Sequence, residues 1–135
     1  GNAAAAVSST FTIDTVPPTL TISSPAAGLI TNKAALNVTG KTNDATSSPI
    51  TLTMTLNGTS LGTVTVGSDG SFTKAVTLAE GTNSIVVTAK DGAGQTTSIT
   101  LSVKLDTTVP ELKGITLSPN PVSTSASVAI TVEVS

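Results

Sequence analysis

Three carboxylates near the two ends of the chain, Asp14, Asp106 and Glu111, are the side chains whose type and spacing best suit chemistry. Calcium takes about six to eight oxygen ligands from carboxylates and backbone carbonyls, and such oxygens converge where one domain joins the next. The sequence therefore makes these residues candidates for an interdomain calcium site. Asp14 and Asp106 could instead accept hydrogen bonds from Thr and backbone groups within a turn, which needs no ion. With so few carboxylates at each joint we expect no cofactor, and calcium is the alternative.

The chain lacks the side chains that most enzymes use. It has no His, Cys, Tyr or Trp, and its six basic residues are all Lys. Its many Ser and Thr hydroxyls have no partner that could activate them as nucleophiles. The sequence therefore predicts no catalytic residue and a protein that is not an enzyme.

Glycan binding is a further chemical option. Sugar rings usually stack on exposed aromatic side chains, and the only aromatics here are Phe11 and Phe72. Phe72 falls in an alternating apolar pattern, which favours a place in the core. Recognition of a glycan by polar side chains alone stays open as an alternative.

Charge and hydropathy exclude two classes of partner. Charged residues make up 10% of the chain and the net charge is −2, without a basic stripe for nucleic acid or a polybasic patch for a membrane surface. No apolar run approaches the roughly 20 residues of a membrane span, so we expect no membrane insertion. Without Cys, disulfides cannot contribute to stability.

The elements that position these residues are strands. Apolar residues alternate with Thr, Ser and Lys between Gly-rich turns, as in antiparallel strands that bury one face. The tightest predicted turns are Asn57-Gly58, Asp69-Gly70 and 91–94. The predicted strands cover 7–15, 19–22, 29–31, 35–41, 50–56, 61–66, 71–78, 83–90 and 97–105. This spacing predicts an all-β fold, an immunoglobulin-like or fibronectin III-like antiparallel sandwich of about seven strands.

The alternation also predicts the core. Lys74 falls on the inward face of its strand, so we expect that strand to lie at a sheet edge or to carry a bulge. The predicted inward residues are Leu20, Ile22, Leu36, Val38, Ile50, Leu52, Met54, Leu56, Val64, Val66, Phe72, Val76, Leu78, Ile85, Val87, Ala89, Ile99, Leu101, Val103 and Leu105.

A repeat becomes visible when the two ends are compared. Residues 11–25 resemble residues 103–119: each has an apolar strand end, Asp-Thr, a Val-Pro pair, a Leu/Ile strand and Ser-Pro. The offset of about 90 residues is typical of tandem sandwich domains. We therefore expect residues 1–15 to end a preceding repeat or form a linker strand, 16–106 to form the sandwich, and 107–135 to begin a following repeat.

The predicted partners follow from this division. Residues 128–134 alternate Val128, Ile130, Val132 and Val134, which gives an apolar face that two strands alone cannot bury. We expect this piece to pair with residues 7–15, with the central domain or with another copy of the chain. The partners are then neighbouring domains of the same polypeptide, with self-association through the terminal strands as a property of the isolated chain.

The central unit resembles bacterial immunoglobulin-like modules, most closely the type found as the B domain of glucodextranase. The pattern is Pro-x-Leu-x-Ile-x-x-Pro at 18–25, Val-x-Gly at 38–40, Asp-Gly-x-Phe at 69–72, Leu-x-Glu-Gly-x-Asn at 78–83 and Ile-x-Val-x-Ala-x-Asp-x-x-Gly at 85–94. Many fibronectin-like sandwiches carry a Tyr where this chain has Asn83. Since a tyrosine corner is impossible here, we expect the Asn83 amide to bond to backbone groups instead.

The resemblance implies an extracellular or cell-surface bacterial module that spaces or presents other domains without catalysing a reaction. Such modules also occur in adhesins, which implies a surface protein or a glycan as a further partner. The alternative is an accessory, carbohydrate-associated module of an extracellular glycoside hydrolase. The likeness alone does not make the chain an enzyme.

Overall fold

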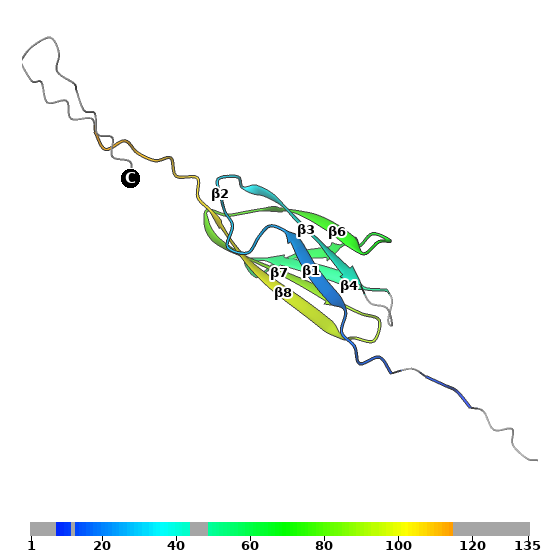
Figure 1. Ribbon diagram of the computed structural model, residues 1–135. Coiled ribbons are helices and arrows are strands. Elements are labelled where there is room, and N and C mark those ends of the chain that lie inside the picture. The colour runs from blue at the N-terminus through cyan, green and yellow to red at the C-terminus, as the bar shows by residue number, and fades with distance from the viewer. Residues whose placement is uncertain (1–7, 12, 44–48, 115–135) are drawn as a thin grey trace, which may run out of the picture.

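The computed structural model describes residues 8–11, 13–43 and 49–114, and it folds them into two packed β-sheets without a helix in these ranges (Figure 1). Eight strands form the sheets. They are β1 (Thr19–Ser24), β2 (Ile30–Thr31), β3 (Ala35–Asn43), β4 (Thr51–Leu56), β5 (Thr59–Val64), β6 (Ser71–Thr77), β7 (Gly81–Lys90) and β8 (Thr96–Leu105). The predicted sandwich is confirmed, and each predicted strand between residues 19 and 105 matches an observed one to within two residues at either end.

The two sheets differ in size. One holds three strands in the order β1-β3-β6, and the other holds five in the order β2-β8-β7-β4-β5. All pairings are antiparallel except that of β2 with β8, because the chain leaves the first sheet after β1 and crosses to the edge of the second. β7 is the central strand of the larger sheet, and its long antiparallel pairing with β8 runs from Gly81–Leu105 to Lys90–Thr96.

The turns form as their residue types predict. Asn57 and Gly58 join β4 to β5 with positive φ angles of 51° and 80°, as a two-residue hairpin of this twist requires. Asp91 closes the β7–β8 hairpin: its N–H donates to the Gln95 carbonyl, and its Oδ1 accepts from the Gln95 N–H at 2.8 Å. The glycines and aspartates of these loops thus serve the turns.

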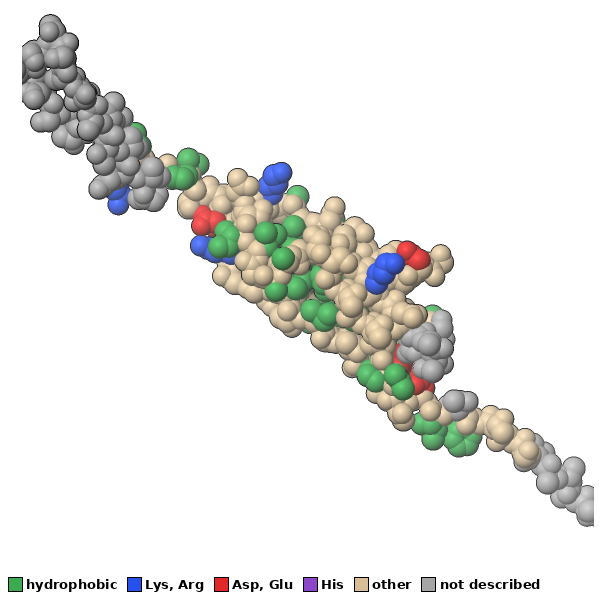
Figure 2. Space-filling model, in the orientation of Figure 1, with side chains coloured by type: hydrophobic (Ala, Val, Ile, Leu, Met, Phe, Trp, Pro, Cys, Tyr) green, Lys and Arg blue, Asp and Glu red, His purple; other side chains and the backbone are tan. Residues whose placement is uncertain are grey.

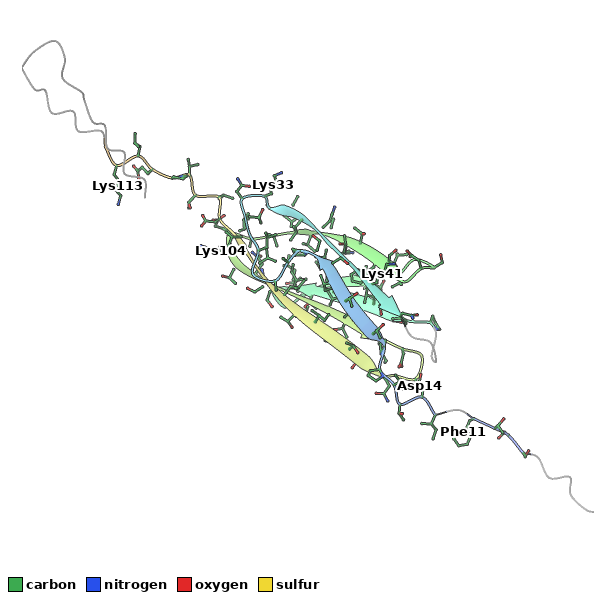
Figure 3. All side chains as sticks on the ribbon, in the orientation of Figure 1. Phe11, Asp14, Lys33, Lys41, Lys104 and Lys113 are labelled. Atoms are coloured by element: carbon green, nitrogen blue, oxygen red, sulfur yellow. The ribbon has the colours of Figure 1, made fainter. Side chains whose placement is uncertain are left out.

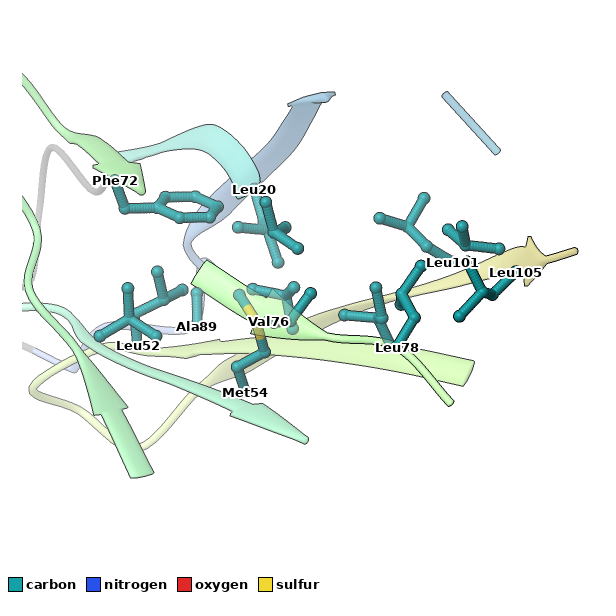
Figure 4. Close-up of a cluster of buried hydrophobic side chains, with 14 residues drawn as sticks. Leu20, Leu52, Met54, Phe72, Val76, Leu78, Ala89, Leu101 and Leu105 are labelled. Atoms are coloured by element: carbon teal, nitrogen blue, oxygen red, sulfur yellow. The ribbon is translucent and has the colours of Figure 1, made fainter. Parts of the chain in front are cut away.

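The core lies between the sheets and consists of aliphatic side chains around one ring (Figure 4). Its buried apolar members were all predicted to face inward: Leu20, Val38, Leu52, Met54, Val64, Phe72, Val76, Leu78, Ile85, Val87, Ala89, Leu101, Val103 and Leu105. Three buried polar residues, Thr42, Asn83 and Asp91, were not part of that expectation.

The Phe72 ring packs against a residue without a side chain. Gly40 pairs with Phe72 across β3 and β6, and a Cβ on Gly40 would stand 2.7 Å from Phe72 Cζ and 2.1 Å from the Thr21 carbonyl oxygen. The Val-x-Gly and Asp-Gly-x-Phe parts of the sequence pattern therefore contact each other. The Phe72 ring occupies the space that a side chain at position 40 would need.

Two further expectations concern strands. Lys74 is partly buried on β6, which lies at the edge of the small sheet, as predicted. The prediction of a strand over 7–15 is wrong for 8–11 and 13–15, which carry no strand. Alternation alone does not make a strand, because the backbone groups need a neighbouring strand to pair with.

The predicted C-terminal face of Val128, Ile130, Val132 and Val134 lies outside the described residues. Within the described part of the chain, there is no helix long and apolar enough to span a membrane.

Candidate functional site

The features that could serve a function lie at the two ends of the sandwich, where the chain enters and leaves (Figure 1). At the exit, Glu80 from the β6–β7 loop holds the segment that follows β8. Glu80 Oε1 accepts a hydrogen bond from the Thr107 N–H at 3.1 Å, and Oε2 accepts one from the Thr107 hydroxyl at 2.8 Å. Both oxygens of the carboxylate thus bind one residue, which fixes the direction in which the chain leaves the domain.

Asp106 lies one residue before this contact. Its Oδ1 accepts from the Thr108 N–H at 3.2 Å and from the Thr108 hydroxyl, and its Oδ2 lies 3.2 Å from the Lys104 ammonium. The Thr108 and Lys104 hydrogen bonds together hold the pKa of Asp106 below its usual range. Asp106 thus closes a turn with Thr108, an arrangement that needs no ion.

Acidification is expected to release the Thr108 turn. Because the folded-state pKa of Asp106 lies below its ordinary value of 3.8, its stabilising contribution is complete above the unfolded pKa and is lost as the pH falls through the folded one. The measurement is the NMR chemical shift of the Thr108 amide, followed from neutral pH downward. Asp106→Asn should abolish the titration. A Thr108 amide that titrates identically in this variant would contradict the assignment.

At the entry, two contacts hold the segment before β1. The Val16 N–H donates to Asp14 Oδ1 at 3.0 Å, and the Thr97 hydroxyl on β8 donates to the Pro18 carbonyl at 2.6 Å. Pro18 is fully buried. The entry segment is therefore tied to β8 at the opposite end from the exit.

The three candidate calcium ligands are divided between the two joints. Figure 3 shows Asp14 beside the entry segment and Lys104, the ion-pair partner of Asp106, at the opposite end of the domain. Glu111 lies with Asp106 on the exit segment, and both border one open hollow of about 500 Å³. Among the described residues, no group of three or more His, Cys, Asp or Glu could hold a metal ion.

Sequence reasoning overlooked Glu80 as a residue of the joint. Its contact with Thr107 spans 27 residues and depends on how β6 and β8 are placed, so the local sequence does not reveal it. Its position inside Leu-x-Glu-Gly-x-Asn was the one available signal.

Asn83 supports the same loop from beneath, as predicted. Its Nδ2 donates to the carbonyls of Ala79 at 2.7 Å and Gly81 at 3.0 Å, and its Oδ1 accepts from the Ala79 N–H at 2.9 Å. The Asn57 side-chain amide donates to the same oxygen at 3.0 Å. All four hydrogen bonds that an amide can make are therefore formed by a side chain with no exposed surface.

A shallow cavity of about 270 Å³ lies near the entry end. It is bordered by Thr42, Asn43, Pro49, Ile50, Val66, Gly67, Ser68 and Gly70. None of these residues is aromatic or charged, so they offer a glycan hydrogen bonds and small apolar surfaces but no ring for stacking.

Comparison with known families decides what kind of domain this is. Residues 18–107, two thirds of the chain, match the family described as glucodextranase, domain B. The chain belongs to this family. The matched range of the glucodextranase domain B unit starts at the Pro18 held by Thr97 and stops at the Thr107 held by Glu80. No curated protein matches the chain.

Solved structures share the fold at low sequence identity. Fibronectin(III)-like modules of Clostridium thermocellum CbhA superpose with a TM-score of 0.54 at 18% identity, covering 67% of this chain and 47% of that one. The endo-beta-1,4-mannanase from Thermotoga petrophila gives a TM-score of 0.57 at 13% identity, covering 69% of this chain and 20% of the enzyme. The glucodextranase domain B fold is thus that of a fibronectin III-like sandwich, and the chain spans half or less of the length of these proteins.

Proposed function

We propose that this domain is a non-catalytic spacer in an extracellular or surface protein, which holds the segments before and after it at a fixed separation. The observation that carries the proposal is that hydrogen bonds hold the chain at both ends of β8. Thr97, near the start of β8, holds Pro18, while the end of β8 leads directly to the Thr107 held by Glu80. From Thr97 to Leu105 the strand rises about 27 Å, which sets a minimum distance between entry and exit.

The sheet pairing makes this separation stiff. β8 is an inner strand of the larger sheet, with β7 on one side and β2 on the other. The pairing with β7 runs along the whole of β8, whereas β2 pairs only with Lys104 and Leu105 at the end of this strand. Buried Leu101, Val103 and Leu105 fix the register of the strand. A load applied between the two linkers would therefore act along a strand that is paired with β7 throughout and with β2 at its exit end.

The second candidate is an accessory module of a glycoside hydrolase. It is favoured by the family, which is named after a domain of glucodextranase, and by the likeness to part of a mannanase. A spacer and an accessory module are compatible, since an accessory module can act by positioning a catalytic domain. Adhesion or direct glycan contact would be an additional property, and the cavity near Pro49 is where we would expect it.

A distance measurement between spin labels tests the spacer role. Since the chain has no Cys, Val16→Cys and Val109→Cys give a unique pair of sites, and both side chains are exposed. We expect a single narrow distance distribution centred beyond the roughly 27 Å rise of β8. A broad distribution would contradict the proposal.

Titrating the labelled protein with oligosaccharides tests whether the domain also contacts glycans. Mannan and glucodextran fragments should leave both the distance distribution and the amide chemical shifts unchanged if the domain only spaces its neighbours. Saturable shifts at Pro49 neighbours such as Ile50 and Ser68 would instead assign glycan contact to the cavity.

A further inference from the structure

Two segments 92 residues apart have the same sequence pattern and the same local structure. Asp14 and Asp106 each follow an apolar residue, precede a Thr and lead to a Pro four residues on, Pro18 and Pro110. Each carboxylate accepts the N–H of the residue two positions later, at 3.0 Å from Val16 and 3.2 Å from Thr108. The turn at the entry is therefore a second copy of the turn at the exit.

The two copies differ in what surrounds them. Before the exit turn, Val103 and Leu105 on β8 are 0% and 4% exposed. Their counterparts before the entry turn, Phe11 and Ile13, are 81% and 73% exposed. The entry segment thus carries the inward side chains of a last strand without the sandwich that would bury them.

The converse holds after the exit turn. Leu112 is 50% exposed, whereas its counterpart Leu20 on β1 is 8% exposed. Figure 2 shows apolar side chains standing out on both linkers, and Figure 3 labels Phe11 on the entry segment. Each linker therefore presents the half of a joint that a neighbouring sandwich would complete.

We propose that Asp106 to Pro110 is a rigid joint to a following immunoglobulin-like repeat. Asp14 to Pro18 is then the corresponding joint to a preceding repeat of the same kind. The proposal rests on the spacer function and names the partner: a repeat of the same kind on each side. In the joint, Glu80 of the leading repeat holds Thr107, and the counterpart of Thr97 in the following repeat holds the Pro110 carbonyl, as Thr97 holds Pro18 here.

The spacing of the two contacts accounts for the rigidity. Only Thr108 and Val109 lie between the Thr107 and Pro110 contacts. Thr108 is fixed by Asp106, and Val109 precedes a proline, which restricts its backbone to extended conformations. The entry copy uses Val16, which also precedes a proline, and Pro17, whose ring fixes φ. Neither copy leaves a freely rotating residue between the domains.

An internal duplication tests the joint. A second copy of residues 16–107 is inserted after Thr107, so that Thr107 of the first repeat is followed by Val16 of the second. In the original chain Val16 likewise follows a threonine, Thr15. Thr73→Cys, an exposed site on β6, is introduced in both repeats for spin labels. We expect amide shifts of two folded repeats and one narrow distance distribution between the labels.

A matched pair of variants tests whether the contact of Glu80 with Thr107 causes the narrow distance distribution. Glu80→Ala in the first repeat should broaden the distance distribution while both repeats stay folded. Asp69→Ala in the same repeat should leave it narrow. Asp69 also accepts two hydrogen bonds from one residue, the Ser71 N–H and hydroxyl, but it lies at the other end of β6 from Glu80.

Two results would overturn the joint. One is a broad distribution in the unmodified duplication, or a second repeat that does not fold. The other is a Glu80→Ala distribution as narrow as that of Asp69→Ala. Either result can coexist with a narrow Val16–Val109 distance in the single chain, in which case the domain is a spacer whose neighbours are flexibly attached.

Discussion

Gly40→Ala is expected to destabilise the domain by about 3 kcal/mol or more, beyond the usual range for adding one methyl group to a core. The new Cβ would lie 2.1 Å from the Thr21 carbonyl oxygen, 2.7 Å from Phe72 Cζ and 2.9 Å from Phe72 Cε1. The Phe72 ring is 3% exposed and cannot turn away without displacing other core side chains. Thr21 is held in the β1–β3 ladder, so relief requires β1 to shift from β3.

Denaturant unfolding of Gly40→Ala against Gly62→Ala measures this cost. Gly62 has a positive φ of 77° and open space around it, so its variant carries backbone strain without a clash. That strain is about 1–2 kcal/mol. We expect Gly40→Ala to be the less stable of the two. Equal unfolding midpoints would show that the Gly40 contact is not the constraint.

A double-mutant cycle separates the ring from the carbonyl. Phe72→Leu removes the ring atoms nearest to Gly40 and leaves the Thr21 carbonyl in place. The double variant should therefore be more stable than the sum of the single changes predicts, by about 1 kcal/mol. Strict additivity would mean that the carbonyl of β1 carries the whole effect.

The close approach of Gly40 to Phe72 illustrates what the sequence does and does not predict. The strands and their buried faces follow from a period of two, which is a local property. The burial of Met54 and Val87 can therefore be predicted without knowing which strands lie beside them. Which strands pair is not local. Gly40 and Phe72 each belong to a recognisable pattern, but only the β3–β6 register shows that the Phe72 ring requires a glycine at position 40.

The same distinction explains the results at the linkers. The alternation that correctly predicts β8 also predicts a strand at Phe11 and Ile13, where none forms. The pattern has the form of a last strand, but in the described part of the chain it pairs with no sheet. Glu80 was overlooked for the opposite reason: its partner Thr107 is present, but 27 residues away along the chain.

Asn83→Ala is expected to cost about 3–4 kcal/mol, a large part of the stability of a domain of this size. The side chain is fully buried and bonds to both backbone groups of Ala79 and to the Gly81 carbonyl. Truncation breaks these part-buried hydrogen bonds before and at the start of β7, together with the one from the Asn57 amide, and each lost bond costs about 1 kcal/mol. It also leaves a space where the amide was, which a water molecule fills only in part.

Thermal unfolding of Asn83→Ala, with Asn37→Ala as the matched control, checks this expectation. Asn37 lies on β3 with an exposed side chain, so its replacement should change stability by less than about 0.5 kcal/mol. Because 1 kcal/mol corresponds to about 4–8 °C for a domain of 60–100 residues, Asn83→Ala should lower Tm by roughly 12–30 °C. A Tm close to that of Asn37→Ala would mean that the β6–β7 loop holds its shape without the amide. Since Glu80 sits in that loop, loss of Asn83 should also weaken its hold on Thr107, visible as a shift of the Thr107 amide at temperatures where the variant is still folded.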